Sequence, residues 1–297
     1  MFTGLSAFPL TPFTADKPDE AAFLRLLQRL TEAKVDSLGV LGSTGSYAYL
    51  TRAQRRRITE LAVAHSEAIP VMVSIGAVST TEVLQLAEDA QQAGAAALLL
   101  PPLGYQALRE EEVFTLYQTV ARHVSVPICV YDNPGTTHFA FSDALLGRIA
   151  ALPGIASIKI PGVPADLLAA RERIAQLRSR LPERVSIGVS GDAFAATGLL
   201  AGCDGWYSVC GGLFPGIAQA MTAAAKAGDD QRVSALDAQL QPLWALFRQH
   251  GGSLRVISAA AGLLGLTERD CLPRPLLPLS DADCQQIAAV LAALDLS

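Results

Sequence analysis

Short apolar runs alternate with longer amphipathic segments along most of this chain. The short runs predict strands at residues 4–10, 38–41, 70–75, 97–100, 126–131, 155–160, 185–189 and 205–209. In the longer segments, apolar residues recur every three or four positions, as on one face of a helix. These segments predict helices at residues 21–33, 51–65, 79–94, 110–123, 142–152, 165–181 and 193–201 and, after the last strand, at 216–227, 230–250, 253–264 and 281–294. Strands and helices therefore alternate, which favours parallel βαβ units.

The repeat predicts an α/β fold, a (β/α)8 TIM barrel with a C-terminal helical extension. One strand and one helix recur about every 30 residues, and eight such units close a barrel. We assign residues 1–228 to the barrel and residues 229–297 to helices packed on it. An open doubly wound sheet is the competing fold, but it usually carries a glycine-rich phosphate loop after its first strand. Residues 9–12 read Pro-Leu-Thr-Pro, which favours the barrel.

The composition argues against several classes of function. The chain has 297 residues, 51% of them hydrophobic, and a net charge of −5, so it offers no basic surface for nucleic acid. No charge-free apolar run approaches the roughly 20 residues of a membrane span, and no secretory signal is recognised at the N-terminus. The five cysteines are scattered without a C-x-x-C pair, as in reducing compartments. We therefore expect a cytoplasmic protein that binds neither nucleic acid nor membrane, and the scattered histidines predict no metal site.

Lys159 is the first residue whose position suggests chemistry. It lies inside the apolar strand at 155–160, whereas Lys17, Lys34 and Lys226 lie in polar or small-residue surroundings. Burying an ammonium group costs on the order of several kcal/mol unless the group is paired or loses its proton. Desolvation lowers the pKa of a lysine, and the neutral amine forms Schiff bases with carbonyl compounds. The alternative is a structural lysine that reaches water or pairs with a carboxylate.

A barrel would bring further polar groups to this lysine, because reactive groups gather where its strands end. Within the strand, Ile155, Ser157 and Lys159 are expected to share one face by the two-residue period. The other groups expected at strand ends are Ser43, Thr44, Tyr131, Asp192 and Tyr207. Structural interpretations stay open for residues 42–45 and 132–135 as turns, Tyr131 as a core aromatic residue and Asp192 as a loop anchor. An amine surrounded by hydroxyl groups is suited to a carbonyl compound with an acid group.

Taken together, these motifs resemble the dihydrodipicolinate synthase / N-acetylneuraminate lyase family of Schiff-base aldolases and lyases. The resemblance covers nearly the whole chain and includes Gly42-Ser43-Thr44-Gly45, Tyr131-Asp132-Asn133-Pro134, Ile158-Lys159 and Ser190-Gly191-Asp192, in that order. It implies that Lys159 forms an imine with pyruvate or a related 2-oxo acid, while Tyr131 moves protons and positions the substrate. It implies further that no metal or organic cofactor takes part.

The resemblance also implies roles for other residues. Ser43 would belong to a proton relay, and Thr44 would hold the carboxylate of the 2-oxo acid. The backbone carbonyl of Tyr207 would face the lysine. Tyr105 resembles a tyrosine that family members insert into the site of a neighbouring subunit, although this match requires one extra residue at 103–104. Members are commonly tetramers built from dimers, so a homo-oligomer is expected.

Departures from the family pattern concern the second substrate. Thr136 stands where the synthase has an arginine that binds the carboxylate of its second substrate. Ala193 and Pro161 stand where sialic acid lyases usually carry an acid and a threonine, and Ser46 replaces a common glutamate. We therefore predict a lyase acting on pyruvate or a related 2-oxo acid, by aldol cleavage or dehydration of a small 2-oxo-3-deoxy sugar acid or 4-hydroxy-2-oxo acid. The alternatives are 4-hydroxy-tetrahydrodipicolinate synthase itself and a catalytically idle barrel that binds a metabolite.

Overall fold

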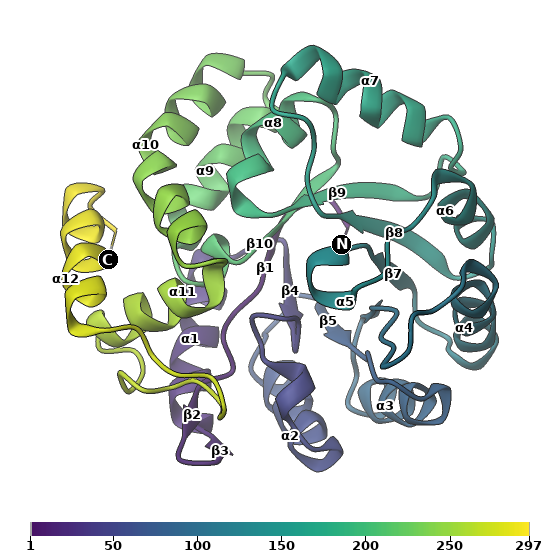
Figure 1. Cartoon of the computed structure of the whole chain (residues 1–297), viewed down its shortest axis with the longest axis horizontal. Coiled ribbons are helices and arrows are strands. Elements are labelled where there is room, and N and C mark those ends of the chain that lie inside the picture. Colours follow the sequence, from purple (N-terminus) through teal and green to yellow (C-terminus); the bar gives the residue numbers. More distant parts are fainter. Residues whose placement is uncertain (1, 297) are drawn as a thin grey trace.

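Parallel strands form a closed barrel at the centre of the molecule (Figure 1). The computed structural model describes residues 2–296, so the predicted limits at residues 1 and 297 lie outside the described residues. Within residues 2–296 the barrel has eight strands, namely β1 (Gly4–Ala7), β4 (Ser37–Val40), β5 (Val71–Ser74), β6 (Ala97–Leu100), β7 (Ile128–Tyr131), β8 (Ile155–Ile160), β9 (Ser186–Ser190) and β10 (Gly205–Ser208). Neighbouring strands follow the chain order, and β10 closes the barrel by pairing with β1. The predicted TIM barrel is therefore confirmed.

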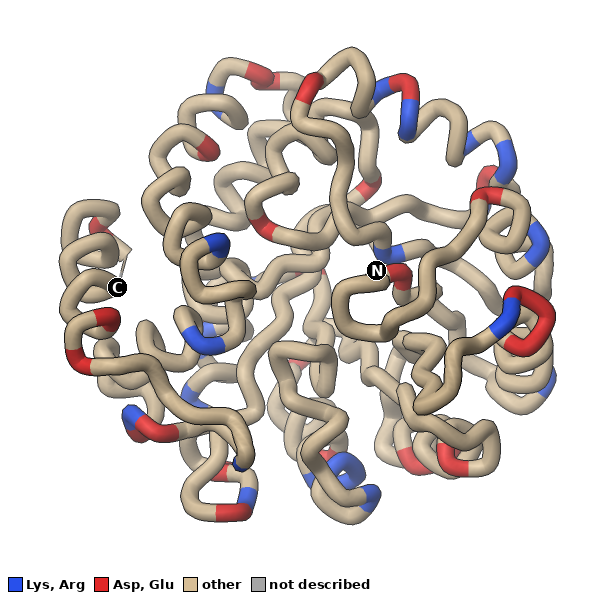
Figure 2. Tube along the Cα trace, in the orientation of Figure 1, with Lys and Arg blue, Asp and Glu red and all other residues tan. Residues whose placement is uncertain are grey.

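Helices form a ring around the strands (Figure 1). Those that follow the barrel strands are α1 (Glu20–Ala33), α2 (Arg52–Ala64), α3 (Thr80–Gln92), α4 (Glu110–His123), α6 (Asp143–Ala150), α7 (Leu167–Arg178), α8 (Ala195–Leu200) and α9 (Pro215–Lys226). Local hydrogen bonds define where they begin: Thr51 and Gln54 form a capping box on α2, and Ser79 caps α3. Charged residues lie mostly on this outer ring (Figure 2), as expected for helices that bury one apolar face.

Several short elements are absent from the predicted pattern. β2 (Phe13–Thr14) and β3 (Lys17–Pro18) form a small antiparallel hairpin between β1 and α1. A single-turn helix, α5 (Pro134–Thr137), follows β7 where the sequence predicts a turn. Short 3-10 helices are η1 (Tyr47–Tyr49), η2 (Asp192–Phe194) and η3 (Cys210–Gly212). Periodicity cannot detect such short elements, yet α5, η1 and η2 shape the loops at the carboxyl ends of the strands.

The barrel interior forms a hydrophobic cluster separate from the helical coat. Its members are Phe8, Met72, Ala97, Leu99, Cys129, Tyr131 and Tyr207. The rings of Phe8 and Tyr207 meet edge to face, with centroids 6.1 Å apart. They fit because Gly39 and Gly188 have no side chain: a Cβ added at Gly39 would overlap Phe8, and one at Gly188 would overlap Tyr207. The two aromatic rings therefore depend on the two strand glycines.

The predicted face of β8 is partly wrong. Cys129 pairs with Ser157, whereas the preceding Ile128 pairs with Ile155, so the register shifts between these positions. An extra residue of this kind is a β-bulge, and it breaks the two-residue alternation. Ile155 consequently belongs to the outer cluster, while Ser157 and Lys159 contact side chains inside the barrel. The alternation holds only from residue 157 onward.

The C-terminal part of the chain forms α10 (Asp230–Gln249), α11 (Ser253–Leu263) and α12 (Asp281–Ala293). α10 packs on α8 and α9, and α12 packs on α11. In Figure 1 these helices lie on one side of the ring. None of the helices within residues 2–296 has both the length and the apolar character needed to cross a membrane.

Gly188→Ala should destabilise the protein by about 1–3 kcal/mol, because the added methyl group overlaps the buried Tyr207 ring. Denaturant unfolding followed by circular dichroism measures the change. The matched control is Gly216→Ala in α9, where an added Cβ meets nothing within 4 Å. This control should stabilise the helix by up to about 1 kcal/mol. Equal stability of the two variants would contradict this account of the barrel interior.

Candidate functional site

Lys159 lies inside the barrel on β8 and is 5% exposed. Its Nζ lies 4.0 Å from the ring centroid of Phe8 and 4.5 Å from that of Tyr131. Among residues 2–296, no carboxylate forms an ion pair with this amine. Aromatic faces attract an ammonium group and can hold it without a counter-ion. The geometry therefore does not fit a lysine that reaches open water or pairs with a carboxylate.

Tyr131 stands beside Lys159 at the end of β7, because the two residues are register partners. Its Oη lies 2.9 Å from Ser43 Oγ and accepts a hydrogen bond of 2.9 Å from Asn133 Nδ2. Burial raises the pKa of Tyr131, but the Lys159 ammonium and neighbouring hydrogen bonds lower it, and the balance lies below the ordinary value. A phenol of this kind can exchange protons with the amine and with a bound carbonyl compound.

The loop after β4 brings Ser43 and Thr44 to this region. Leu41 and Ser46 bracket the loop in the left-handed backbone region, with φ of 57° and 55°, which costs about 1–2 kcal/mol for each residue. The Ser46 backbone N–H donates to the Ser43 carbonyl at 3.1 Å, and Thr44 is 5% exposed. This bent loop brings Ser43 within 2.9 Å of Tyr131 Oη, and the binding role expected for Thr44 stays a prediction.

Tyr207 connects the site to the polar part of the barrel interior. Its ring centroid lies 5.9 Å from Lys159 Nζ, and its hydroxyl lies 2.6 Å from Ser157 Oγ. Ser186 Oγ donates to Ser157 Oγ at 2.8 Å, and Cys129 Sγ donates to the Tyr207 hydroxyl at 3.5 Å. These buried polar groups satisfy one another, as buried polar groups must. The role expected for the Tyr207 backbone carbonyl stays a prediction.

Asp192 is a loop anchor, as one of its interpretations predicts. Its carboxylate accepts hydrogen bonds of between 2.8 and 3.2 Å from Trp206 Nε1, Ser208 Oγ and the backbone N–H groups of Val209 and Cys210. Burial raises the pKa of Asp192 to about 6, while these hydrogen bonds oppose the rise. The carboxylate therefore joins the loops after β9 and β10.

Tyr105 and Thr136 lie at the surface of the chain. Tyr105 is 90% exposed in the segment between β6 and α4, so the chain itself does not bury it beside Lys159. Its insertion into another subunit stays a prediction. Thr136 is an exposed residue of α5, and its hydroxyl donates to the Asn133 carbonyl at 3.3 Å. α5 thus offers a hydroxyl group where the synthase pattern has a guanidinium.

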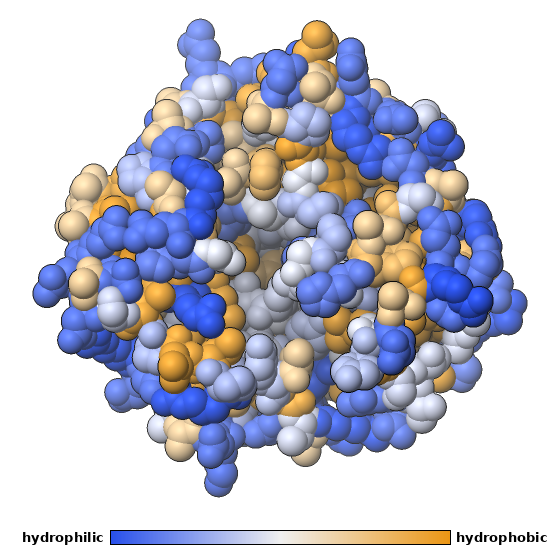
Figure 3. Space-filling model, in the orientation of Figure 1, coloured by the Kyte–Doolittle hydropathy of each residue, from blue (hydrophilic) through white to orange (hydrophobic). Residues whose placement is uncertain are grey.

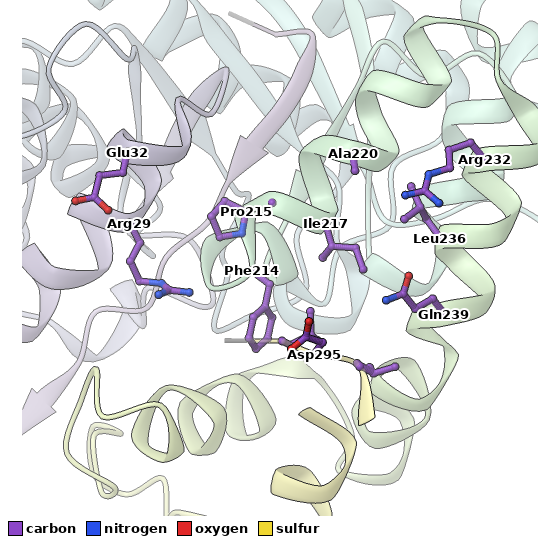
Figure 4. Close-up of a pocket in the computed structure, with 13 residues that line it drawn as sticks. Arg29, Glu32, Phe214, Pro215, Ile217, Ala220, Arg232, Leu236, Gln239 and Asp295 are labelled. Atoms are coloured by element: carbon purple, nitrogen blue, oxygen red, sulfur yellow. The ribbon is translucent and has the colours of Figure 1, made fainter. Parts of the chain in front are cut away.

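Hollows of different character lie at the centre of the molecule and on its outside. Figure 3 shows a hollow near the centre of the molecule, where residues of intermediate hydropathy lie between hydrophilic and hydrophobic ones. A separate cavity of about 510 Å³ lies outside the barrel among α1, α9 and α10 (Figure 4), where Arg29, Glu32, Arg232 and Asp295 bring charges of both signs. None of the predicted site residues lines this outer cavity. The residues suited to carbonyl chemistry are thus held by the barrel strands and their loops.

Sequence comparison assigns the chain to a known family. The pattern of the dihydrodipicolinate synthetase family matches residues 1–294. The chain belongs to this family. Like its other members, this dihydrodipicolinate synthetase family protein is a lyase that works through a lysine Schiff base.

Named relatives cover the whole length of the chain. The 4-hydroxy-tetrahydrodipicolinate synthase of Rhodospirillum centenum is 30% identical over 299 residues, which cover 98% of each chain. The crystal structure of dihydrodipicolinate synthase from Agrobacterium tumefaciens is 47% identical, with a TM-score of 0.95 over 99% of this chain and 98% of that one. A structure described as the first monomeric dihydrodipicolinate synthase variant is 26% identical, with a TM-score of 0.91 over 100% and 98% of the two chains.

The structure adds Phe8 and Asn133 to the site of this family member, and the sequence analysis missed both. Phe8 lies in a continuous apolar run at 4–10, which gives no sign of which residues face inward. Asn133 lies in a segment with a strong turn signal. Its position two residues after Tyr131 could have placed both side chains on one face of an extended strand.

Lys159→Met should raise the pKa of Tyr131 above its ordinary value, because burial then acts without the opposing ammonium charge. Ultraviolet difference titration of tyrosinate measures the shift, and Tyr131→Phe in each background isolates the signal. Lys226→Met, at an exposed position of α9, is the matched control and should leave the titration unchanged. A Tyr131 titration that is the same in Lys159→Met and wild type would show that the two groups are not coupled.

Proposed function

We propose that Lys159 forms a Schiff base with pyruvate or a related 2-oxo acid. One observation carries this proposal: the amine is 5% exposed and lies against the Phe8 and Tyr131 rings, without a carboxylate partner in the described part of the chain. An amine shielded from water in this way is a better nucleophile towards ketones than a solvated ammonium group. Membership of the family supports the same chemistry.

The proposed reaction begins when Tyr131, as the phenolate, takes a proton from Lys159. The neutral amine then forms a C–N bond to C2 of the 2-oxo acid, and the former carbonyl oxygen leaves as water after receiving protons through Tyr131 and Ser43. The protonated imine withdraws electrons from C3. A C–H or C–C bond at C3 can now break, and its electron pair forms the enamine. The enamine adds to an aldehyde or takes up a proton, and water finally hydrolyses the imine.

We infer that the loop after β4 holds the carboxylate of the 2-oxo acid. Left-handed backbone at Leu41 and Ser46 bends the loop, and successive N–H groups in such bends form concave anion sites. The buried Thr44 would add its hydroxyl group and backbone N–H. This pose directs the ketone carbon towards Lys159, with the backbone carbonyl of Tyr207 facing the amine.

The second substrate has two candidate identities. The named relatives are synthases, which favours addition of the enamine to aspartate semialdehyde. Thr136 favours the other candidate, because α5 offers a neutral hydroxyl where a carboxylate clamp would be needed. That candidate is the cleavage or dehydration of a small 2-oxo-3-deoxy sugar acid or 4-hydroxy-2-oxo acid. The names of the relatives weigh more, so the synthase reaction is the first to assay.

We further propose that the chain works in the cytoplasm as a dimer or tetramer. Tyr49, Val78 and Tyr105 are exposed at 45%, 65% and 90%. They follow β4, β5 and β6, which are neighbours in the barrel, so they lie towards one side of its rim. A second copy of the chain would cover these side chains and bring its Tyr105 near the site.

Sodium borohydride should trap pyruvate on the peptide that contains Lys159, because reduction of an imine leaves a stable secondary amine. Peptide mass spectrometry locates the adduct. Lys159→Ala should stay folded and gain no adduct, whereas Lys34→Ala, an exposed site, should be labelled like wild type. Unchanged metabolite binding by Lys159→Ala, together with no trapping in wild type, would instead support the idle barrel.

Thr136→Arg should raise kcat/KM for aspartate semialdehyde by roughly 10- to 100-fold, because a guanidinium adds charge-assisted hydrogen bonds to a carboxylate. A coupled assay with pyruvate measures it, and Thr136→Gln is the neutral control of comparable length. Pyruvate release from 2-oxo-3-deoxy sugar acids and 4-hydroxy-2-oxo acids is assayed in parallel. Fast turnover of aspartate semialdehyde by wild type, with no gain from Thr136→Arg, would establish the synthase without this clamp.

A further inference from the structure

Tyr131 accepts a hydrogen bond that the proposed reaction does not require. Asn133 Nδ2 donates to Tyr131 Oη at 2.9 Å, and Ser43 Oγ lies 2.9 Å from the same oxygen. A phenol can donate its one proton and can also accept hydrogen bonds. Because the amide nitrogen only donates, it occupies an acceptor position of the phenol. When Tyr131 is protonated, its proton is free to point towards Ser43, and either of these two oxygens can be the donor.

Helix capping is the common role of an asparagine at this position, and Asn133 does not perform it. Asn133 is the N-cap residue of α5, yet its side chain makes no capping hydrogen bond. An N-cap side chain normally accepts a hydrogen bond from a backbone N–H in the first turn of its helix. Here φ is −150° and ψ is 81°, and the amide instead contacts Tyr131. Capping therefore does not account for the residue.

The backbone of Asn133 is held in place by α5. Its carbonyl accepts hydrogen bonds of 3.0 Å from the backbone N–H groups of both Thr136 and Thr137. The hydroxyl groups of the same threonines donate to it at 3.3 and 3.0 Å. Thr137 is buried, with 3% exposure. A donor whose backbone is held in this way loses little conformational freedom when it binds the phenol. Less entropy is lost, so the hydrogen bond is more favourable in free energy.

We propose that Asn133 is a positioning residue that fixes the Tyr131 hydroxyl for proton transfer to Ser43. The inference depends on the proposed function, because it assumes that Tyr131 moves protons at the Lys159 imine. The amide orients the phenol while it is protonated and stabilises the phenolate after the proton has left. The resemblance implies that a tyrosine from a neighbouring subunit completes the site. In this chain Asn133 and Ser43 both lie within hydrogen-bond distance of Tyr131 Oη, so the role of the amide does not depend on that tyrosine.

Titratable and charged groups approach Tyr131 from several elements. Lys159 faces it from β8, and Tyr47 of η1 interacts with it electrostatically. Arg55 of α2 lies 5.3 Å from the Tyr47 ring centroid. Tyr117 of α4 lies next to the Tyr131 backbone, and the carboxyl group of Asp132 is adjacent in sequence. Substitution of Asn133 leaves these groups in place, so a shifted pH profile reports on the amide.

The test measures the rate of borohydride-trapped imine formation with pyruvate across pH in two Asn133 variants. Asn133→Leu removes the donor at similar volume and should slow imine formation about tenfold at neutral pH, with the rate rising only at higher pH. Asn133→Asp keeps the shape but presents only acceptors to the phenol, so it should slow the reaction more than leucine does. Gln176→Leu, which removes an exposed amide of α7, is the control and should change neither the rate nor the profile.

An unchanged rate and pH profile in both Asn133 variants would overturn the proposal, and so would a loss in Gln176→Leu equal to that in Asn133→Leu. If wild type traps no pyruvate, the proposed function fails. The inference about Asn133 can still be tested, because NMR titration of ring-labelled tyrosine measures the Tyr131 pKa in the resting protein. Asn133→Leu should then show a higher Tyr131 pKa than wild type, and an equal pKa would overturn it. Denaturant unfolding shows which of the two Asn133 variants are folded, and one folded variant is sufficient for the test.

Discussion

A buried lysine amine without a carboxylate counter-ion is the constraint on which the rest of the site depends. A carboxylate partner would hold the amine in an ion pair and away from a substrate. Here aromatic faces take the place of the counter-ion, with Nζ 4.0 Å from the Phe8 ring centroid. Phe8 in turn fits inside the barrel because Gly39 leaves room for its ring. The absence of a side chain at Gly39 thus makes room for the ring that contacts the reactive amine of Lys159.

The groups around the amine are held by two kinds of loop. One has left-handed backbone that costs free energy, and the other is anchored by buried hydrogen bonds. Leu41 and Ser46 keep left-handed backbone on either side of Ser43 and Thr44, which a fold tolerates only where the surroundings enforce it. The Asp192 carboxylate joins the loops after β9 and β10 through buried hydrogen bonds. Preorganisation of this kind matters because proton transfer needs donor and acceptor within hydrogen-bond reach before the reaction starts.

The barrel could be predicted because its alternating strands and helices give a periodic pattern of apolar residues in the sequence. The packing of side chains inside the barrel gives no such pattern. The match of predicted and observed elements follows from apolar periodicity and capping residues such as Thr51 and Ser79. Lys159 was recognisable because a charged residue inside an apolar run is anomalous. Phe8 was not recognisable, because one aromatic residue in an apolar run is ordinary. Ile155 was assigned to the wrong face, because a bulge depends on the pairing of two strands far apart in sequence. The sequence at 132–135 predicts only a turn for Asn133, because its contact with Tyr131 needs α5, which is too short to give a periodic pattern.

The site divides into a half that makes the imine and a half that meets the second substrate, and the two are subject to different constraints. In the proposed reaction, imine formation would use Lys159, Tyr131 and Ser43 whichever aldehyde follows. The second half depends on side chains at the rim, such as Thr136. α5 connects these two parts of the site, because the same helical turn holds Asn133 against Tyr131 and places Thr136 at the exposed surface. A substitution at Thr136 removes one hydroxyl contact to the Asn133 carbonyl but keeps the backbone N–H of Thr136 and both hydrogen bonds from Thr137, so the acceptor preference can change while the proton carrier stays in place.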